Sequence, residues 1–260
     1  MNAVYPWPSQ DIVELTGRDR LDFLHRLSSQ FFRDLQAGDC RPAAFLNAQG
    51  QVLFYFYALE ETEKTLLFVL PGQAEALRDH LERFHFSEAL EYNIGTAGRY
   101  VEVREGGGLR FTPQNPGPRE FMNLQQWKES RIQHLEPISE DCYGSPVLLL
   151  ETGLYSYFHP NKGCYPGQEV VERILMKGDV PRKAMVLSWQ EPIAEGAPLS
   201  VFREGAKVGQ LGKIIETREG NWGYAMVLRT QCDGSATYAL GSPEGPRTKV
   251  QALAGPLPRP

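Results

Sequence analysis

The C-terminal part of the chain carries the pattern that most restricts its fold. Short runs rich in β-branched and aromatic residues are separated by turns that contain Pro and Gly. The runs are Ala184–Trp189, Leu199–Phe202, Lys207–Leu211, Lys213–Thr217, Trp222–Val227, Thr237–Leu240 and Lys249–Ala252. Strands of this length and spacing are typical of a small antiparallel barrel. The sequence therefore predicts a C-terminal β-barrel domain over residues 182–260, with its boundary near Gly178 to Arg182.

Residues 1–181 mix strand and helix patterns, which predicts an α+β region. Apolar residues recur at helical spacing after Gly17–Asp19, from Ala74 to Phe84, from Leu124 to Leu135 and after Pro166. The predicted strands are Asp11–Leu15, Ala43–Leu46, Gln51–Leu59, Thr65–Leu70, Glu91–Ile94, Arg99–Val103 and Pro146–Leu154. The connection Asn47–Gly50 suits a tight turn, so the second and third of these strands are predicted to form a hairpin.

Composition excludes several classes of function. The chain has 260 residues, of which 42% are hydrophobic, so it can bury a sizeable core. Lys and Arg total 27 against 32 Asp and Glu. This acidic balance lacks the excess of positive charge that general nucleic-acid or membrane-surface binding requires. The four cysteines are scattered without metal-ligand spacing, which argues against a resident zinc or iron–sulfur site. No secretory or membrane-spanning pattern is present, and we expect a cytoplasmic monomer.

The segment Lys162–Glu169 is the candidate site for chemistry. Cys164 lies beside Gly163 and close to Lys162, just before the helix predicted to begin near Pro166 or Gly167. A helix N-terminus and a neighbouring cation both favour a thiolate, which is the nucleophilic form of sulfur. The alternative is that Cys164 is a small residue that fills a tight bend.

Three segments carry a resemblance to known families. Lys162–Glu169 resembles the signature K-G-C-Y-x-G-Q-E of the YgfZ-like folate-binding proteins, which are related to the glycine-cleavage T-protein, an aminomethyltransferase. Leu15–Leu24 is similar to the opening L-x-G-x-D-x-x-x-F-L of both families, and Leu150–Gly153 to an L-E-x-G motif of T-proteins. The resemblance implies two interleaved α+β portions, together residues 1–181, around a central folate cavity, followed by a β-barrel.

The resemblance also implies roles for individual residues. Glu151 would accept hydrogen bonds from the pterin ring of tetrahydrofolate or a derivative, unless it is simply an exposed glutamate at the end of a strand. Cys164 would be the catalytic thiol, with Lys162 as its cation. Among the other motif residues, Gly163 and Gly167 would allow close approach of a partner, and Tyr165, Gln168 and Glu169 would shape the loop or contact a ligand. Arg173 fits either this site or an exposed helix face.

One departure from the T-protein pattern separates two functions. T-proteins carry an essential acidic residue on the strand after the first hairpin turn, whereas Gly50–Tyr57 contains no carboxylate. We therefore expect no aminomethyl transfer, but a folate-binding accessory protein that supports iron–sulfur cluster assembly or repair in client enzymes, and thereby tRNA modification. A folate-dependent one-carbon transferase that uses Cys164 or Glu151 is the alternative, and an interaction scaffold without folate is a third.

Overall fold

The computed structural model describes residues 4–103, 109–112, 117, 119–144 and 146–258. The chain divides into two compact units, of which the first comprises Met1–Trp127 and Ser156–Val170, and the second Lys128–Tyr155 and Val171–Pro260. This division differs from the predicted domain ranges of 1–181 and 182–260, because residues 128–155 and 171–181 group with the C-terminal sheet.

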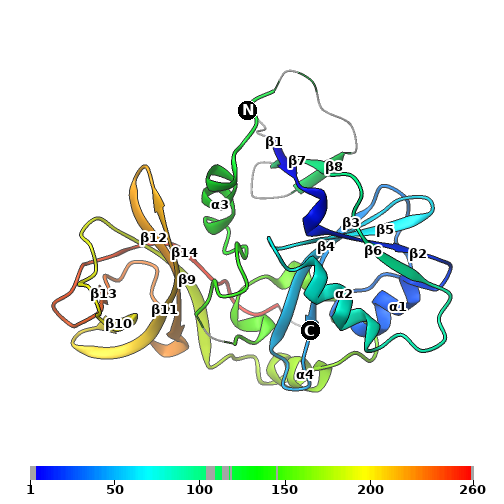
Figure 1. Ribbon diagram of the computed structural model, residues 1–260. Coiled ribbons are helices and arrows are strands. Elements are labelled where there is room, and N and C mark those ends of the chain that lie inside the picture. The colour runs from blue at the N-terminus through cyan, green and yellow to red at the C-terminus, as the bar shows by residue number, and fades with distance from the viewer. Residues whose placement is uncertain (1–3, 104–108, 113–116, 118, 145, 259–260) are drawn as a thin grey trace. The chain divides into compact units, whose positions relative to one another are not determined.

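The first unit contains a five-stranded antiparallel sheet in the order β3-β4-β5-β2-β6 (Figure 1). Its strands are β2 (Ile12–Thr16), β3 (Cys40–Leu46), β4 (Val52–Glu60), β5 (Lys64–Val69) and β6 (Glu91–Ile94). The predicted hairpin is confirmed, because β3 and β4 pair directly across the turn that Asn47 and Gly50 close.

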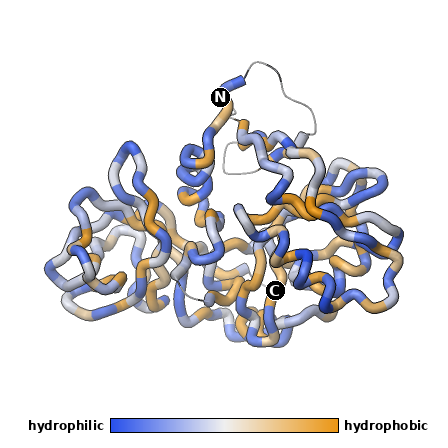
Figure 2. The backbone as a smooth tube through the Cα atoms, in the orientation of Figure 1, coloured by the Kyte–Doolittle hydropathy of each residue, from blue (hydrophilic) through white to orange (hydrophobic). Residues whose placement is uncertain are grey.

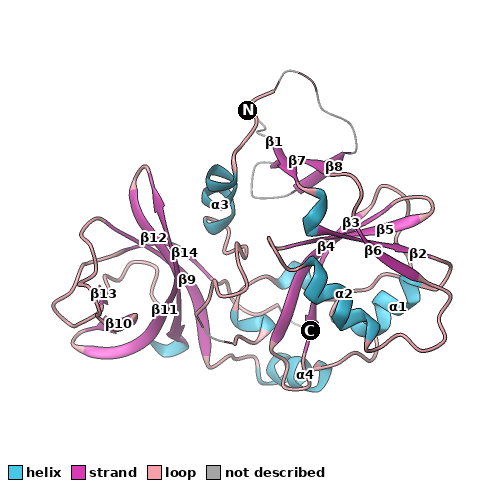
Figure 3. Ribbon diagram, in the orientation of Figure 1, coloured by secondary structure: helices cyan, strands magenta, loops and turns pink. Residues whose placement is uncertain are grey.

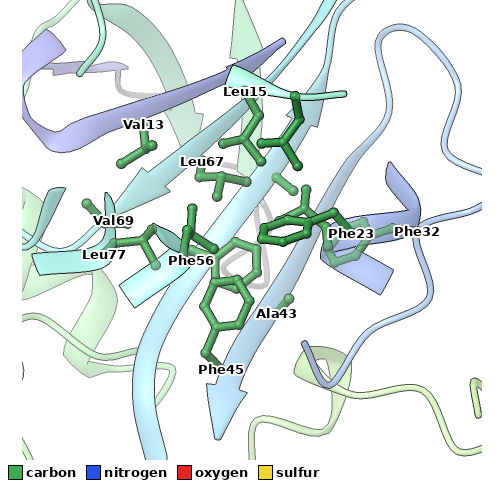
Figure 4. Packing of buried hydrophobic residues seen from close by; sticks show 14 of the residues in the cluster. Val13, Leu15, Phe23, Phe32, Ala43, Phe45, Phe56, Leu67, Val69 and Leu77 are labelled. Carbon is green, nitrogen blue, oxygen red and sulfur yellow. The ribbon is translucent and has the colours of Figure 1, made fainter. Parts of the chain in front are cut away.

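Two amphipathic helices cover one face of this sheet, α1 (Arg20–Leu27) and α2 (Ala74–Glu82). Their apolar residues Phe23 and Leu77 pack with Phe56 and Leu67 of the sheet in a continuous core (Figure 4). Alternation along β4 sends Phe56 to this core, whereas Leu59 belongs to a second cluster.

A three-stranded sheet completes the first unit, in the order β1-β7-β8. Its strands are β1 (Val4–Trp7), β7 (Arg99–Val103) and β8 (Leu109–Thr112). Only β7 was predicted from the sequence. Pro6 lies within β1 opposite Tyr100, and because a proline has no N–H to donate to a ladder, its presence in such a short run argues against a strand when only the sequence is considered. Tertiary packing holds β1 in place, since Tyr5 stacks on Trp127 with ring centroids 4.6 Å apart.

The second unit contains a six-stranded antiparallel sheet in the order β13-β10-β11-β12-β9-β14 (Figure 3). Its strands are β9 (Arg182–Trp189), β10 (Ser200–Arg203), β11 (Ala206–Thr217), β12 (Gly220–Leu228), β13 (Ala239–Leu240) and β14 (Lys249–Leu253). The N–H groups of Thr248 and Leu240 donate to the carbonyl oxygens of Tyr238 and Pro246, so the residues just before β14 bond to the β13 segment. The predicted barrel is thus an antiparallel sheet whose two edges are linked by these bonds.

One long strand replaces two predicted short ones in this sheet. β11 runs through Gly212, and its register against β12 shifts between Leu211 and Ile214. A Cβ atom on Gly212 would lie 2.3 Å from the carbonyl oxygen of Cys142, so only glycine fits where residues 142–144 meet the strand. Figure 2 shows hydrophobic segments along the strands of both units and hydrophilic turns between many of them.

Two further helices, α3 (Leu124–Ile132) and α4 (Gln168–Lys177), each contain residues assigned to both units. Both were predicted. The predicted strand Pro146–Leu154 is wrong, because this segment contains a 3-10 helix over Leu149–Glu151. The Glu151 carboxylate accepts the Leu148 N–H at 3.0 Å, and Thr152 donates its hydroxyl to the Leu149 carbonyl at 2.7 Å. Such local side-chain bonds compete with a sheet ladder.

Candidate functional site

The Cys164 loop belongs to the first unit and leads into α4, which begins at Gln168. Cys164 is exposed. Gly163 and Gly167 have φ angles of 92° and 83°, a region that favours glycine, so both positions let the chain turn sharply around the thiol. The loop therefore displays a thiol to solvent on a tightly bent backbone.

Lys162 holds this loop to α1. Its ammonium donates to the carbonyl oxygen of His25 and, at 2.6 Å, to that of Ser28, the residue that caps the C-terminus of α1. A cation there complements the negative end of the helix dipole. Sequence reasoning placed this charge beside the thiol; the structure buries it instead in the cap of α1, with 4% of the residue exposed.

The charge of Lys162 nevertheless reaches the loop that it anchors. Burial and, less strongly, the charge of Arg33 lower the pKa of Lys162 to about 8, although the nearby Cys164 acts in the opposite direction. The ammonium also lies 4.5 Å from the ring centroid of Tyr165, a cation–π contact within the motif.

Buried polar groups fasten the segment that precedes the loop. The hydroxyl of Ser29 donates to the Tyr157 carbonyl at 2.6 Å and accepts the Ala44 N–H at 3.0 Å. The amide of Gln30 donates to the Ser156 carbonyl at 2.8 Å. The bonds to Tyr157 and Ser156 connect residues that the sequence separates by more than a hundred positions. They make residues 156–167 an integral part of the first unit.

Two glycines bring the start of α4 against the β3–β4 hairpin. A Cβ atom on Gly167 would lie 2.6 Å from the carbonyl oxygen of Asn47 and 3.0 Å from the Cα of Gly50. A Cβ atom on Gly50 would in turn lie 2.8 Å from the Cβ of Val170. Gly167 was predicted to admit a partner, but in this structure it admits the hairpin backbone.

The remaining motif residues have different surroundings. Tyr165 and Gln168 are half-buried, and the Gln168 N–H donates to the Tyr165 carbonyl at 3.2 Å. Glu169 is exposed in the first turn of α4, where a carboxylate complements the helix dipole. Arg173 is exposed on the part of α4 that groups with the second unit, which fits a helix-surface residue.

Glu151 lies in the second unit and is fully buried. Its Oε1 accepts from Nε of Arg182 at 2.9 Å, and its Oε2 accepts from Nη2 of the same guanidinium at 2.8 Å. The interpretation of Glu151 as an exposed strand-end residue is therefore wrong. Arg182, the first residue of β9, is the site residue that sequence reasoning missed, because a lone arginine at a strand start carries no local sign of its partner.

Strand β4 follows the turn of the β3–β4 hairpin, where T-proteins are expected to carry an acidic residue. From Gly50 through Tyr57 there is no carboxylate, and the strand instead places Tyr55 and Tyr57 with their ring centroids each 5.8 Å from that of Tyr157. The acid of β4 is Glu60, which is buried and paired with Arg20. That pairing occupies the carboxylate in the structure.

Neither a metal cluster nor a membrane helix is apparent among the residues described. No group of three or more His, Cys, Asp or Glu side chains in this part of the chain is arranged to hold a metal ion. None of its helices is both long and apolar enough to cross a bilayer.

Comparison with known proteins identifies similar sequences. The chain matches no family model. It is 28% identical over 122 residues to a chloroplastic protein of Arabidopsis thaliana named as a transferase, covering 46% of this chain and 28% of that protein. It is 26% identical over 149 residues to the sesamin methylene transferase of Sinomonas sp. (strain No.22), covering 55% and 29%. The matched region thus spans less than a third of either relative.

The structure gives a more extensive match. The glycine cleavage system aminomethyltransferase T of Bartonella henselae superposes with a TM-score of 0.65 at 13% identity, over 96% of this chain and 85% of that one. The chain has a T-protein-like fold. At 13% identity the likeness concerns the fold alone.

Proposed function

We propose that this chain is a folate-binding protein of the YgfZ-like type, which supports assembly or repair of iron–sulfur clusters in other enzymes and does not transfer aminomethyl groups. The observation that carries this proposal is the hairpin of the T-protein-like fold. It has no carboxylate from Gly50 through Tyr57, and the acid further along β4, Glu60, is paired with Arg20. Without an available acid there, the group that would activate a folate amine is missing.

Tetrahydrofolate or a derivative is the proposed ligand, with Glu151 as its acceptor. A carboxylate can accept two parallel N–H bonds, and the Arg182 guanidinium demonstrates that Glu151 has the geometry to do so. The pterin ring offers a comparable pair of N–H groups. Glu151 is therefore suited to recognise the ring, provided that its present partner is displaced.

Cys164 is the proposed point of contact with client enzymes or cluster-assembly proteins. Its thiol is exposed on a loop that Lys162 and two glycines fix in place, so a partner can approach it without unfolding the unit. Support for iron–sulfur enzymes would affect tRNA modification indirectly, through those enzymes that perform it. We propose that the protein acts as a monomer in the cytoplasm and needs no direct contact with nucleic acid.

Calorimetry with tetrahydrofolate and with its 5-formyl derivative tests the first half of this proposal. Saturable binding of either compound is the expected result. A chain that binds no folate, yet still binds its protein partners, would be an interaction scaffold. Activity of iron–sulfur enzymes in a strain lacking the protein tests the second half, and unaltered activity there would contradict the accessory role.

A folate-dependent one-carbon transferase is the second candidate. The names of the relatives favour it, since one is a sesamin methylene transferase and the structural neighbour is an aminomethyltransferase. In this case Cys164 or Glu151 would replace the missing acid. Transfer of a labelled one-carbon unit from the folate to an acceptor distinguishes this candidate, because an accessory protein leaves the label on the folate.

A further inference from the structure

The ion pair between Glu151 and Arg182 is asymmetric in its exposure. The Glu151 side chain is fully buried, whereas 32% of the Arg182 side chain is exposed. Arg182 also donates from Nη2 to the Pro146 carbonyl at 3.2 Å, which anchors the guanidinium beside the segment that carries Glu151. The guanidinium is therefore the solvent-facing member of the pair.

The carboxylate of Glu151 is close to its hydrogen-bonding capacity. It accepts two N–H bonds from Arg182 and a third from the backbone of Leu148 at 3.0 Å. A carboxylate has about four acceptor positions. A ligand that needs two of them cannot bind to Glu151 while the guanidinium stays in place.

The guanidinium and the pterin ring present the same donor pattern. Nε–H and Nη2–H of Arg182 point in parallel at the two oxygens of Glu151. The 2-amino group and the adjacent ring N–H of a pterin form the same planar pair of donors, at the same spacing. We propose that Arg182 occupies the pterin position on Glu151 and must leave it for folate to bind, so that Arg182 sets the affinity; this inference rests on the proposed folate function.

The consequence is a measurable reduction of affinity. When only a fraction of molecules has the binding site open, the apparent dissociation constant is the intrinsic one divided by that fraction. Removing the guanidinium removes this competition. A residue that instead held Glu151 ready for the ligand would have the opposite effect, because its loss would weaken binding.

The experiment compares tetrahydrofolate binding by the parent, Arg182→Met and Arg182→Lys in calorimetry. Arg182→Met removes both donors, and we expect its dissociation constant to fall at least tenfold. Arg182→Lys keeps a cation but loses the planar fork, so its gain should be smaller. It also provides a folded alternative if the methionine variant does not fold. Arg218→Met is the matched control, since Arg218 is an exposed arginine of the same unit.

A double variant shows whether the gain passes through Glu151. In Arg182→Met combined with Glu151→Gln, the tighter binding should be lost. If the parent binds folate and the folded Arg182 variants bind it equally or more weakly, this inference is overturned while the proposed function stands. If neither the parent nor any Arg182 variant binds folate, the proposed function and this inference both fail.

Discussion

Gly167 and Gly50 meet backbone to backbone, with only 3.0 Å between the Cα of Gly50 and the position that a Cβ on Gly167 would take. This contact seats the beginning of α4 on the β3–β4 hairpin. It links the segment that displays Cys164 to the sheet of the first unit. It also predicts that Gly163 and Gly167, the two glycines of the Cys164 loop, differ in their tolerance of a side chain.

Gly167→Ala should destabilise the protein more than Gly163→Ala. Both substitutions force alanine into the left-handed region, but only at Gly167 does the new methyl group collide with backbone, because nothing lies within 4 Å of a Cβ on Gly163. Overpacking costs about 1–3 kcal/mol beyond the shared conformational strain. Urea unfolding measures the difference, and equal losses for the two variants would contradict the packing described.

Lys162→Met should lower the free energy of unfolding by about 1.5–3 kcal/mol, because it removes charged donors from the carbonyl groups at the end of α1. Lys207→Met is the matched control, since Lys207 is exposed on β11 and should be nearly neutral. Thermal or urea unfolding of both variants at pH 7 is the measurement. A neutral Lys162→Met would show that the ammonium does not support the helix end.

The same pair of proteins, parent and Lys162→Met, should show a pH-dependent difference in stability. The pKa of Lys162 is about 8 in the folded protein against an ordinary 10.5, so between these values the unfolded chain binds more protons. The parent should therefore gain stability relative to Lys162→Met as the pH rises from 7 to 10. A relative loss over that interval would mean that the folded state favours the charged form.

Cys164 should be the thiol that reacts first with an alkylating reagent at pH 7.5. Burial raises the pKa of Cys40 and of Cys142, and it raises that of Cys232 to about 11, whereas Cys164 is exposed. Mass spectrometry of the native protein should find one rapidly modified cysteine, and Cys164→Ser should abolish that modification. Rapid labelling of Cys232 would contradict the burial described.

Cys164→Ser should abolish function without affecting the fold. We expect its stability to stay within about 1 kcal/mol of the parent, because the side chain is exposed and nearly unchanged in volume. Iron–sulfur enzyme activity in a dependent strain should fall as far as in a deletion, whereas Cys232→Ser should support it. Full complementation by Cys164→Ser at equal abundance would remove the thiol from the mechanism.

Glu151→Gln should cost stability as well as folate affinity. The buried Glu151 carboxylate is paired with the partly exposed guanidinium of Arg182, and weakening such a charged hydrogen-bonded pair costs about 1.5–3 kcal/mol. Glu169→Gln, at an exposed position of α4, is the control and should unfold close to the parent. An unfolding midpoint shared by all three proteins would mean that the pair contributes nothing.

Local periodicity explains which parts of the fold were predictable. The three- and four-residue spacing among Leu21, Phe23, Leu24 and Leu27 identified α1. The Asn47–Gly50 turn identified the hairpin, and both signals lie within a few neighbouring residues. The segment around Glu151 was misjudged because its apolar run resembles a buried strand, while side-chain bonds to its own backbone close a 3-10 turn.

Partners distant in sequence explain most of the rest. Lys162 bonds to a carbonyl group 137 positions earlier, and Glu151 pairs with an arginine 31 positions later. The motif around Cys164 drew attention to Lys162 as a charged residue. It carried no information that the charge is buried at the end of a helix, since that depends on how the chain returns to its first unit.

The return of residues 156–170 to the first unit has a consequence for the order of folding during synthesis. The strands β2 to β6 and both helices over them are complete once residue 94 has been made. The last carbonyl groups of α1 meet the Lys162 ammonium, and the hydroxyl of Ser29 finds the carbonyl to which it donates, only when residues 157 and 162 emerge. In a growing chain the residues of the sheet are therefore complete before the carbonyl groups at the end of α1 and the Ser29 hydroxyl have all their hydrogen-bond partners. Cys164 takes its place in the fixed loop only after these bonds have formed.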